Sequence, residues 1–426
     1  MRNPLDKLSS RQVLATVIAV SLGWLFSAVD IILLILFQEE IAADLSVEVQ
    51  ALRVAIGIGL LGSAFGGLFF AQLGDRWGRV RALASSIILY SLATGLMAIA
   101  QSELQLYLLR FIAGLGTGAE WSIGFALLSE VWSDRSRGRV GGLVAGMFNL
   151  GTFVAIALFQ SSLGWRYAFG IMVLPSLFAI TLRRWIPESR VWLNLQHLRS
   201  SASLSDLRKN EIEMSPLKAT FTQNCRGITW RLTLLFVLMN LGFYSFSTVF
   251  INYLKADLSS GGLGLDKEGQ LPFQLALNIT SFVSVVLAGT FSDFLGRRRA
   301  ALGFCLLGFI GFTLLHVQLK ESYGIYSETT LLVPFSLCCM GFGINGVMGV
   351  FAPELFPTHL RSTGPGVSQN LGKGIGGMAG PPLAGFFVAQ QGFPFVLGLP
   401  AYLFILIAVL IYSFPEVGGR SLYEEE

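Results

Sequence analysis

Two stretches of this 426-residue chain repeat one pattern of glycine and charged residues. The first stretch reads Gly74-Asp75-Arg76-Trp77-Gly78-Arg79-Val80-Arg81, and the second reads Ser292-Asp293-Phe294-Leu295-Gly296-Arg297-Arg298-Arg299. Both contain Asp-x-x-Gly-Arg, and both lie where one apolar segment turns back into the next. Because the copies stand about half a chain apart, the pattern predicts a molecule built from two similar halves.

Three further pairs of motifs extend the repeat in the same order. They are Glu130 and Arg137 with Glu354 and Arg361, Asn149-Leu150-Gly151 with Asn370-Leu371-Gly372, and Pro187-Glu188-Ser189 with Pro415-Glu416-Val417. The separation between partners runs from 218 residues (Asp75 to Asp293) to 228 residues (Pro187 to Pro415). Four matches in one order are hard to obtain by chance, so we interpret them as a duplication.

The composition places this chain in a membrane. It is 53% hydrophobic and 13% charged, with a mean hydropathy of +0.64, which is too apolar for a soluble chain of this length. Apolar runs of about 20 residues, the length that crosses a bilayer, recur throughout. We expect twelve spans, at 13–37, 54–74, 82–100, 105–132, 140–162, 165–186, 228–254, 269–292, 300–319, 330–356, 363–390 and 393–414. The predicted fold class is an all-α membrane protein with twelve transmembrane helices in two six-helix repeats.

The positive charges predict the orientation of these helices. Of the 30 Lys and Arg residues, 23 fall on the side of the repeated loops and five on the other side. Because cytoplasmic loops carry the excess of Lys and Arg, both termini are expected in the cytoplasm. We expect an N-terminal half at 1–186, a cytoplasmic linker at 187–227 and a C-terminal half at 228–426. The basic balance follows from topology, and no nucleic-acid partner is expected.

Four motifs then connect the chain to a known family. They are Asp75-x-x-Gly78-Arg79, Arg110-x3-Gly114-x-Gly116-x-Gly118, Pro187-Glu188-Ser189-Arg190 and Pro415-Glu416-Val417-Gly418-Gly419-Arg420. With them the whole chain resembles the major facilitator superfamily. This resemblance implies alternating-access transport of a small molecule by two rocking halves, without a cofactor. Duplicated secondary transporters place the substrate site between their repeats.

Other motifs favour one branch of that family. The two Pro-Glu motifs are similar to those of sugar porters and metabolite–proton symporters. Gly118-Ala119-Glu120-Trp121 and Asn370-Leu371-Gly372-Lys373 look most like the sialate and monocarboxylate proton symporters. The expected seventh helix reads Leu238-Met239-Asn240-Leu241-Gly242-Phe243-Tyr244-Ser245 and lacks the Gln-Gln pair and Ser-Gly of sugar porters. This difference disfavours a neutral-sugar substrate.

Four ionisable residues fall inside the predicted spans: Asp30, Arg110, Glu120 and Lys373. A charge at bilayer depth costs roughly 2.5–3.5 kcal/mol, so each is a functional candidate. Helix rise places Asp30 and Arg110 at similar depth, where they are expected to pair. Glu120 and Lys373 are expected near the midplane, in different halves. The alternatives are a static ion pair, an interhelical carboxylate and a lysine at a packing seam.

These residues and three neutral groups form the predicted transport site. Proton coupling is expected from Asp30, Arg110 and Glu120. Substrate binding is expected from Arg110, Glu120, Asn240, Tyr244, Asn345 and Lys373, because amides and a phenol at that depth can hydrogen-bond a carboxylate. Each neutral group could instead bond neighbouring helices. Gly343 and Gly346, beside Asn345, are expected to let a ligand approach.

The repeated loops predict a gate on the cytoplasmic side. Its members are expected to be Asp75, Arg79, Glu130, Arg139, Asp293, Arg297, Glu354 and Arg361. The two aspartates are expected to accept hydrogen bonds from free N–H groups at the start of a neighbouring helix. Small residues permit close helix packing. Glycines at a spacing of four therefore predict sliding surfaces between the halves: Gly62 and Gly66, Gly142 and Gly146, and Gly372, Gly376 and Gly380.

The predicted function is proton-coupled symport of a small organic anion, either a monocarboxylate or an acidic sugar such as sialate. A neutral-sugar symporter and an exporter of drugs or metabolites remain alternatives. An enzyme is not expected, because His197, His316 and His359 lie far apart and the cysteines show no metal-binding spacing. The expected partners are a small-molecule substrate, protons and the bilayer. We expect a monomer in the inner membrane of a bacterium.

Overall fold

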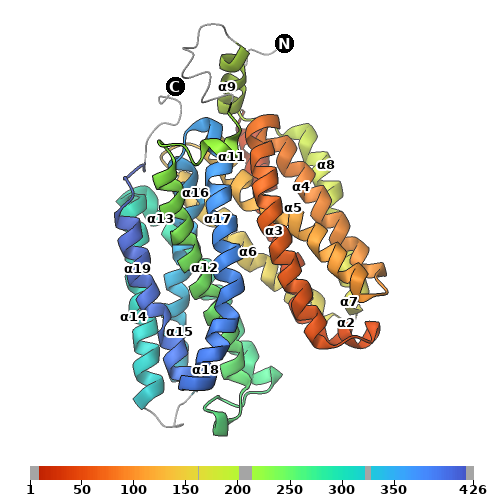
Figure 1. Ribbon diagram of the computed structural model, residues 1–426, viewed down its shortest axis with the longest axis vertical. Coiled ribbons are helices and arrows are strands. Elements are labelled where there is room, and N and C mark those ends of the chain that lie inside the picture. The colour runs from red at the N-terminus through yellow and green to blue at the C-terminus, as the bar shows by residue number, and fades with distance from the viewer. Residues whose placement is uncertain (1–8, 162, 201–213, 322–327, 419–426) are drawn as a thin grey trace.

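The computed structural model describes residues 9–161, 163–200, 214–321 and 328–418, and these fold almost entirely into helices (Figure 1). The first group of helices is α1 (Ser10–Leu36), α2 (Gln38–Leu45), α3 (Val49–Trp77), α4 (Arg79–Leu96), α5 (Glu103–Val131), α6 (Arg137–Gln160), α7 (Gly164–Ile171) and α8 (Leu174–Trp185). A 3-10 turn, η1 (Met97–Ile99), extends α4. Two short helices, α9 (Arg190–Ser200) and α11 (Pro216–Ala219), follow in the predicted linker, whose residues 201–213 lie outside the described part.

The second group begins after the predicted linker. It comprises α12 (Arg226–Lys255), α13 (Lys267–Leu295), α14 (Arg297–Glu321), α15 (Glu328–Gly341), α16 (Asn345–Glu354), α17 (Thr363–Gly372), α18 (Met378–Gly398) and α19 (Pro400–Tyr412). The short 3-10 helices are η2 (Leu258–Ser260), η3 (Phe342–Ile344) and η4 (Thr358–Leu360), and η5 (Lys373–Gly377) is a π-helix. The all-α prediction is confirmed for the described residues.

Most predicted spans correspond to long apolar helices. Nine helical stretches in the described residues are long and apolar enough to cross a bilayer, and a bent pair, 358–398 with Pro400–Tyr412, supplies a tenth candidate. The span expected at 165–186 is divided into the shorter α7 and α8. Inside α18, Gly392 has a φ of 79° and separates the spans expected at 363–390 and 393–414. The count of twelve stays a prediction.

The glycine of each repeated loop makes the reversal of the chain possible. Gly78 has a φ of 110° and Gly296 a φ of 88°, a region that favours glycine. Each glycine ends one helix, and the next helix begins at the following residue. A Cβ atom on Gly78 would lie 2.2 Å from Glu188 Oε2, and one on Gly296 would lie 2.8 Å from Glu416 Oε2. The sharp turn and its glutamate therefore occur twice.

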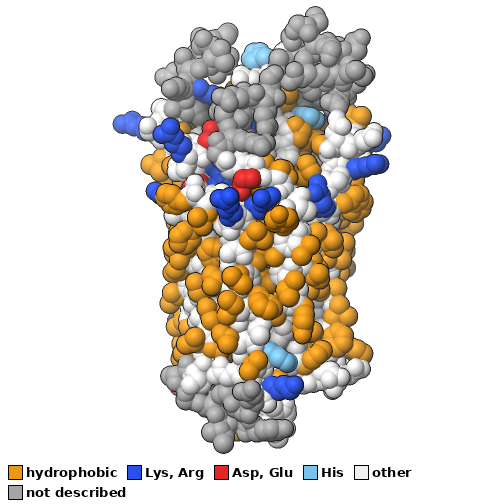
Figure 2. Space-filling model, turned by 90° about the vertical axis from the view of Figure 1, so that its left-hand side faces the viewer, with side chains coloured by type: hydrophobic (Ala, Val, Ile, Leu, Met, Phe, Trp, Pro, Cys, Tyr) orange, Lys and Arg blue, Asp and Glu red, His pale blue; other side chains and the backbone are white. Residues whose placement is uncertain are grey.

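The two groups of helices meet at one end of the molecule. We call the end that holds Asp75 and Asp293 the motif side, and the other end the opposite side. Contacts between the groups join α3 to α17, α6 to α13 and α16, and α5 to α16 and α17. The groups approach each other near the motif side and diverge toward the opposite side (Figure 1). An apolar belt covers one face, bordered toward the motif side by Lys and Arg side chains (Figure 2).

Two of the three glycine patterns pack within one group rather than between the groups. Gly62 and Gly66 lie against the backbone of α5, in the first group. Gly372, Gly376 and Gly380 lie against α12, in the second group. The prediction of a sliding surface between the halves is therefore wrong for these five residues. The spacing predicts close approach to a helix, but it does not say which helix.

The glycines of α6 do lie between the groups. A Cβ atom on Gly142 would lie 2.8 Å from the carbonyl oxygen of Val285, and one on Gly146 would lie 3.0 Å from Phe282. Both partners belong to α13, in the second group. Nearer the motif side, a Cβ atom on Gly289 would lie 2.4 Å from the carbonyl oxygen of Gly138. Backbone therefore packs on backbone where α6 crosses α13.

Candidate functional site

A buried ion pair joins α1 to α5. Arg110 Nη1 lies 2.9 Å from Asp30 Oδ1, and Arg110 Nη2 lies 3.0 Å from Asp30 Oδ2. The hydroxyl of Thr94 on α4 donates a further hydrogen bond to Asp30. Both charged side chains are almost completely buried among apolar residues of the first group. The predicted pairing of Asp30 with Arg110 is confirmed, and its bidentate geometry is that of the stronger charge-assisted hydrogen bonds.

Glu120 lies on the same helix, ten residues and about 15 Å closer to the motif side. It is buried, and neither carboxylate oxygen has a hydrogen bond of normal geometry with the described residues. The hydroxyl of Tyr90 lies beside the carboxylate and interacts with it. A Cβ atom on Gly23 of α1 would lie 3.1 Å from Glu120 Oε1. Burying a carboxyl group without full hydrogen bonding is costly, which marks Glu120 as a functional candidate.

Lys373 lies where the two groups of helices meet. Its Nζ is 3.3 Å from Ser63 Oγ on α3, so it bridges the groups, and its side chain is half-buried. It opens the π-helix η5, a local deviation that often occurs at functional sites. Nearby, Asn370 Nδ2 donates to the carbonyl oxygen of Gly118, also across the groups, at 3.2 Å. Lys373 thus occupies the seam between the halves.

The three neutral candidates are half-buried in the second group. Asn240 donates to the carbonyl oxygen of Phe236 at 2.7 Å, and Asn345 donates to that of Phe342 at 3.0 Å. The ring of Tyr244 packs edge-on against Phe243, with centroids 5.4 Å apart. These contacts hold the two amides against their own helices, while the side chains retain partial exposure.

The glycines beside Asn345 do not open a path for a ligand. A Cβ atom on Gly343 would lie 2.1 Å from Ser284 Oγ, and one on Gly346 would lie 2.0 Å from the carbonyl oxygen of Val285. Both contacts are with α13. The expectation that Gly343 and Gly346 let a substrate approach is therefore wrong, because the space beside them is filled by a packed helix.

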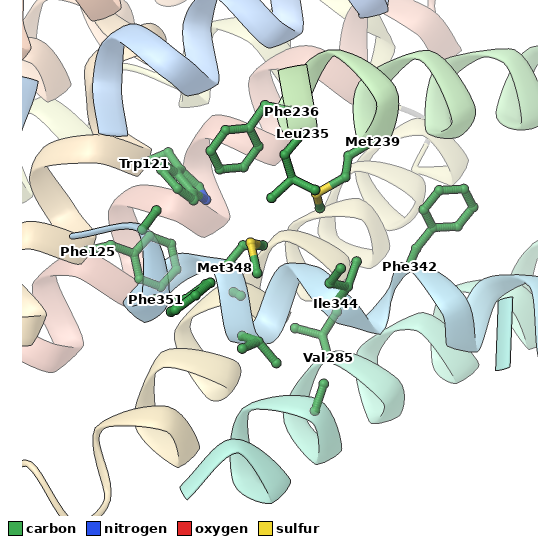
Figure 3. Close-up of a cluster of buried hydrophobic side chains, with 14 of the residues drawn as sticks. Trp121, Phe125, Leu235, Phe236, Met239, Val285, Phe342, Ile344, Met348 and Phe351 are labelled. Atoms are coloured by element: carbon green, nitrogen blue, oxygen red, sulfur yellow. The ribbon is translucent and has the colours of Figure 1, made fainter. Parts of the chain in front are cut away.

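An apolar cluster closes the seam on the motif side of Glu120. Trp121 and Phe125 of α5 meet Phe236 of α12 and Phe351 of α16 (Figure 3). The rings of Trp121 and Phe236 pack edge-on across the two groups, with centroids 5.3 Å apart. A Cβ atom on Gly349 of α16 would lie 2.4 Å from the Phe125 ring. Large side chains from both groups therefore fill the seam between Glu120 and the motif side.

Each repeated aspartate caps a helix of the other group. Asp75 accepts hydrogen bonds from the N–H groups of Ser362 at 3.2 Å and Thr363 at 2.8 Å, where α17 begins. Asp293 accepts from the N–H groups of Gly138 and Arg139, both at 2.8 Å, in the first turn of α6. The predicted capping is confirmed at both positions. A carboxylate at a helix start satisfies free N–H groups and complements the helix dipole.

Each arginine of the repeated motif pairs with a glutamate of its own group. Arg79 lies 3.0 Å from Glu130, and Arg297 lies 3.0 Å from Glu354. Both arginines also pair with the aspartate of their own motif, at 3.0 Å for Asp75 and 2.8 Å for Asp293. The ion pairs are buried. Their symmetry places the same network at the motif-side end of each group.

A second set of arginines links the groups. Arg361 pairs with Glu130 at 3.4 Å, and Arg137 pairs with Glu354 at 2.9 Å. Arg79 also donates to the carbonyl oxygen of Thr358 in the other group at 2.8 Å. Each buried glutamate thus binds one arginine from each group, and the network joins the groups on the motif side.

The prediction that the side chain of Arg139 belongs to this network is wrong. Its side chain is exposed and lies 6.0 Å from the ring of Phe294, and it contributes to the cap only through its backbone N–H. Arg137 occupies the predicted role, because it is the residue of the first helical turn that points to Glu354. The repeated Glu-x6-Arg spacing already distinguished Arg137 from Arg139.

The prediction also missed the glutamates of the two Pro-Glu motifs. Glu188 accepts hydrogen bonds from the N–H groups of Arg79 and Val80, and Glu416 accepts from those of Arg297 and Arg298. Both therefore cap the helix that follows a repeated loop. Burial raises the pKa of the Glu188 carboxyl above its ordinary value, and the hydrogen bonds only partly oppose this effect. The repetition of the motif was the available signal.

Two helical groups joined by crossed caps, with ionisable residues in the seam, define a membrane transporter of duplicated architecture. Residues 18–372 match the sequence profile of the Major Facilitator Superfamily, and the chain belongs to this family. It is a multi-pass integral membrane protein that transports and does not catalyse a reaction.

Individual relatives cover nearly the whole chain. It is 27% identical to the sialic acid transporter NanX of Escherichia coli over 94% of this chain and 93% of the relative. It is 28% identical to the cis,cis-muconate transport protein of Acinetobacter baylyi over 89% of each. The fold is similar to that of the proton:xylose symporter XylE bound to 6-bromo-6-deoxy-D-glucose, with a TM-score of 0.76 and 18% identity over 98% of this chain and 99% of that one.

Proposed function

We propose that this protein is a proton-coupled symporter of a small organic anion, a monocarboxylate or an acidic sugar. The observation that carries the proposal is the bidentate Asp30–Arg110 pair, buried away from the ion pairs of the motif side. The names of two relatives support the substrate class, because sialic acid and cis,cis-muconate are both carboxylic acids. We further propose a monomer with twelve spans, halves at 1–186 and 228–426, in a bacterial inner membrane.

In this proposal the motif side is cytoplasmic, as the excess of positive charge favours. The crossed caps of Asp75 and Asp293 and the apolar cluster around Trp121 then close the cytoplasmic side. The conformation is outward-facing. A proton and an anion enter from outside, and the halves rock so that the motif side opens.

Coupling follows from the charges. A proton on Asp30 removes the partner of Arg110 and leaves a guanidinium that attracts an anion. Arg110 and Lys373 are the cations of the proposed site, and Asn240, Tyr244 and Asn345 supply neutral hydrogen bonds. Glu120, which lies between Arg110 and the seam, is the second candidate for a proton. Because each ligand favours the state that binds the other, the two bind cooperatively, as symport requires.

Uptake into proteoliposomes tests the coupling. Asp30→Asn should abolish accumulation of the acid against its gradient, while exchange of the acid across the membrane continues. The matched control is Asp44→Asn, because Asp44 pairs with Arg166 at 2.8 Å on the partly exposed surface of the same group. Asp44→Asn should accumulate the acid normally. Uphill accumulation by Asp30→Asn would refute Asp30 as the coupling residue and transfer that role to Glu120.

The substrate class is tested separately with wild-type protein. Matched pairs of a carboxylic acid and its amide, including sialate and muconate, are offered as competitors of uptake. The proposal expects inhibition by the acids and little inhibition by the amides. Equal inhibition by both members would contradict an anionic substrate and favour the neutral-sugar alternative, and transport directed outward would favour the exporter.

A further inference from the structure

A groove of about 420 Å³ runs between α14 and α19 on the surface of the second group. This face is turned toward the viewer in Figure 2. Its walls include Leu302, Leu306 and Phe309 on α14 and Ile405, Val409 and Tyr412 on α19. The smaller Cys305 and Ala408 lie between these rows, which creates the hollow. The groove belongs to the apolar surface that faces lipid.

An arginine stands at the motif-side end of this groove. Arg298 precedes Leu302 by one helical turn and therefore lies on the same face of α14. Its guanidinium carbon is 5.1 Å from the centroid of the Tyr412 ring, which itself lines the groove. Its Nη1 also donates to the carbonyl oxygen of Phe414 at 3.4 Å. These contacts hold the positive charge of Arg298 at the motif-side end of the groove.

A second arginine contacts the same chain segment. Arg231 of α12 donates to the carbonyl oxygen of Ser413 at 2.7 Å, and its guanidinium lies 5.3 Å from the centroid of the Phe414 ring. Two guanidinium groups thus flank the end of α19. Each carries five N–H donors, more than these contacts use.

The positive charge of this pair is not neutralised by an ion pair among the described residues. Neither Arg298 nor Arg231 forms one in that part of the chain. Glu416 lies beside Arg298, but its carboxylate accepts the backbone N–H groups of Arg297, Arg298 and Gly418. The side-chain donors of the two arginines remain available for a phosphate.

Arg298 is also dispensable for the loop motif itself. The equivalent position of the first copy is Val80, and the cap, the turn and the Arg79 ion pairs are nevertheless complete there. The repeated motif therefore does not explain why the second copy carries a guanidinium at position 298.

We propose that the groove binds one anionic glycerophospholipid, with an acyl chain between α14 and α19 and the phosphate against Arg298 and Arg231. Leu302 to Phe309 lie 5 to 12 residues into α14, about 8–18 Å from its motif-side end, which is the depth of an acyl chain in that leaflet. Basic pockets between transmembrane helices recognise anionic headgroups. The apolar groove, its depth in the membrane and the two positive charges are therefore all consistent with an anionic phospholipid.

Native mass spectrometry of the purified protein tests this site without a transport assay. Phosphatidylglycerol, phosphatidylethanolamine and phosphatidylcholine with identical acyl chains are compared at equal concentration. Phosphatidylglycerol should be retained preferentially. In the double variant Arg298→Gln with Arg231→Gln, its affinity should fall about fivefold for each charge removed, while that of phosphatidylcholine stays unchanged. Arg76→Gln, an exposed arginine on the motif side outside the groove, should change nothing.

Two further variants keep the test decisive if the double variant does not fold. Arg298→Lys retains the charge and should retain the preference for phosphatidylglycerol. Leu306→Trp fills the groove at an exposed position and should weaken retention of all three lipids. Equal retention of the three lipids by wild type, or unaltered retention in Leu306→Trp, would overturn the proposal. Displacement of the lipid by soluble glycerol phosphate would assign the arginines to a free anion instead.

Discussion

Individual charged residues in this protein differ in what they are paired with. Asp30 and Arg110 pair with each other, and Arg79 and Arg297 on the motif side each bind a glutamate. Glu120 lacks a well-formed hydrogen bond in the described part of the chain, and the hydrogen bond of Lys373 is with a neutral serine. A substrate carboxylate can replace a serine without separating two opposite charges, so Lys373 is the residue best placed to exchange its partner for substrate.

Lys373→Gln should therefore weaken binding of the acid about 10–150-fold. A hydrogen bond to a charged group contributes about 1.5–3 kcal/mol, which corresponds to that range. Isothermal titration of purified protein with an acid identified by uptake measures the change. The matched control is Ser63→Ala, which removes the neutral partner and leaves the charge, and it should bind the acid at least as tightly as wild type. A weaker affinity in both variants would indicate a role in packing.

The two arginines of the α6 start give a second prediction at this scale. Arg137→Gln removes a buried charge-assisted hydrogen bond to Glu354, but Arg297 still neutralises that glutamate. The expected loss is about 1.5–3 kcal/mol, seen as a lower thermal unfolding temperature in detergent. Arg139→Gln, two residues away on the exposed face, should unfold like wild type. The reverse order would contradict the assignment of Arg137 to the network.

Whole helices are joined through their ends. The start of α17 is capped by Asp75 from α3, and the start of α6 is capped by Asp293 from α13. In the proposed transport cycle, opening the motif side would require both helix starts to lose their carboxylate and to be hydrated. The caps would then stabilise the closed motif side specifically, because they are absent once the groups have separated.

Asp75→Asn should shift the population toward an open motif side and slow transport, with little change in the intrinsic affinity for substrate. Loss of the charge weakens the interaction with the helix start by about 0.3–1 kcal/mol, up to ~2 when buried. The measurement is alkylation of a cysteine introduced at Val350, which packs against Gly141 at the seam. Asp257→Asn, at an exposed helix start in the second group, serves as the control. Unchanged alkylation together with normal transport would remove the gating role.

Sequence patterns predicted these helix ends better than they predicted helix neighbours. Asp-x-x-Gly-Arg is a local signal: the glycine requires a positive φ, and the aspartate and arginine lie one turn apart. The spacing of glycines is a less specific signal, because it indicates only that a neighbouring helix packs closely and not which helix this is. Gly62 and Gly142 have the same spacing to their next glycine, yet one meets a helix of its own group and the other a helix of the opposite group.

At the scale of the whole molecule, the two groups close one end and diverge at the other (Figure 1). If the open end faces the outside, the proposed coupling has Asp30 exchange protons with the external medium. Uptake should then rise as the external pH falls, because protonated Asp30 releases Arg110 for the anion. Proteoliposomes with a fixed internal pH and a varied external pH measure this dependence. Uptake that is independent of external pH would contradict proton coupling.

The global arrangement was predictable, whereas the inner surface was predictable only in part. The length of the apolar runs predicted the helices, and the repeated motifs predicted two groups that resemble each other. Depth along a helix gave the Asp30–Arg110 pair, because rise per residue is nearly constant. The direction in which a residue points around its helix was harder to predict. Gly343 and Gly346 share the depth of Asn345 but turn toward α13, and nothing in one sequence states which neighbour occupies that side.

The close crossing of α6 over α13 could be used to stabilise the conformation in which the motif side is open. Gly289 has no room for a methyl group, because its Cβ would stand 2.4 Å from the backbone of Gly138. Gly289→Ala would act as a wedge that holds the motif side apart, while Gly303→Ala, which meets open space on the lipid face, would not. The wedged protein would be a suitable antigen for selecting conformation-specific nanobodies. Such binders would trap the form with an open motif side for imaging without any ligand.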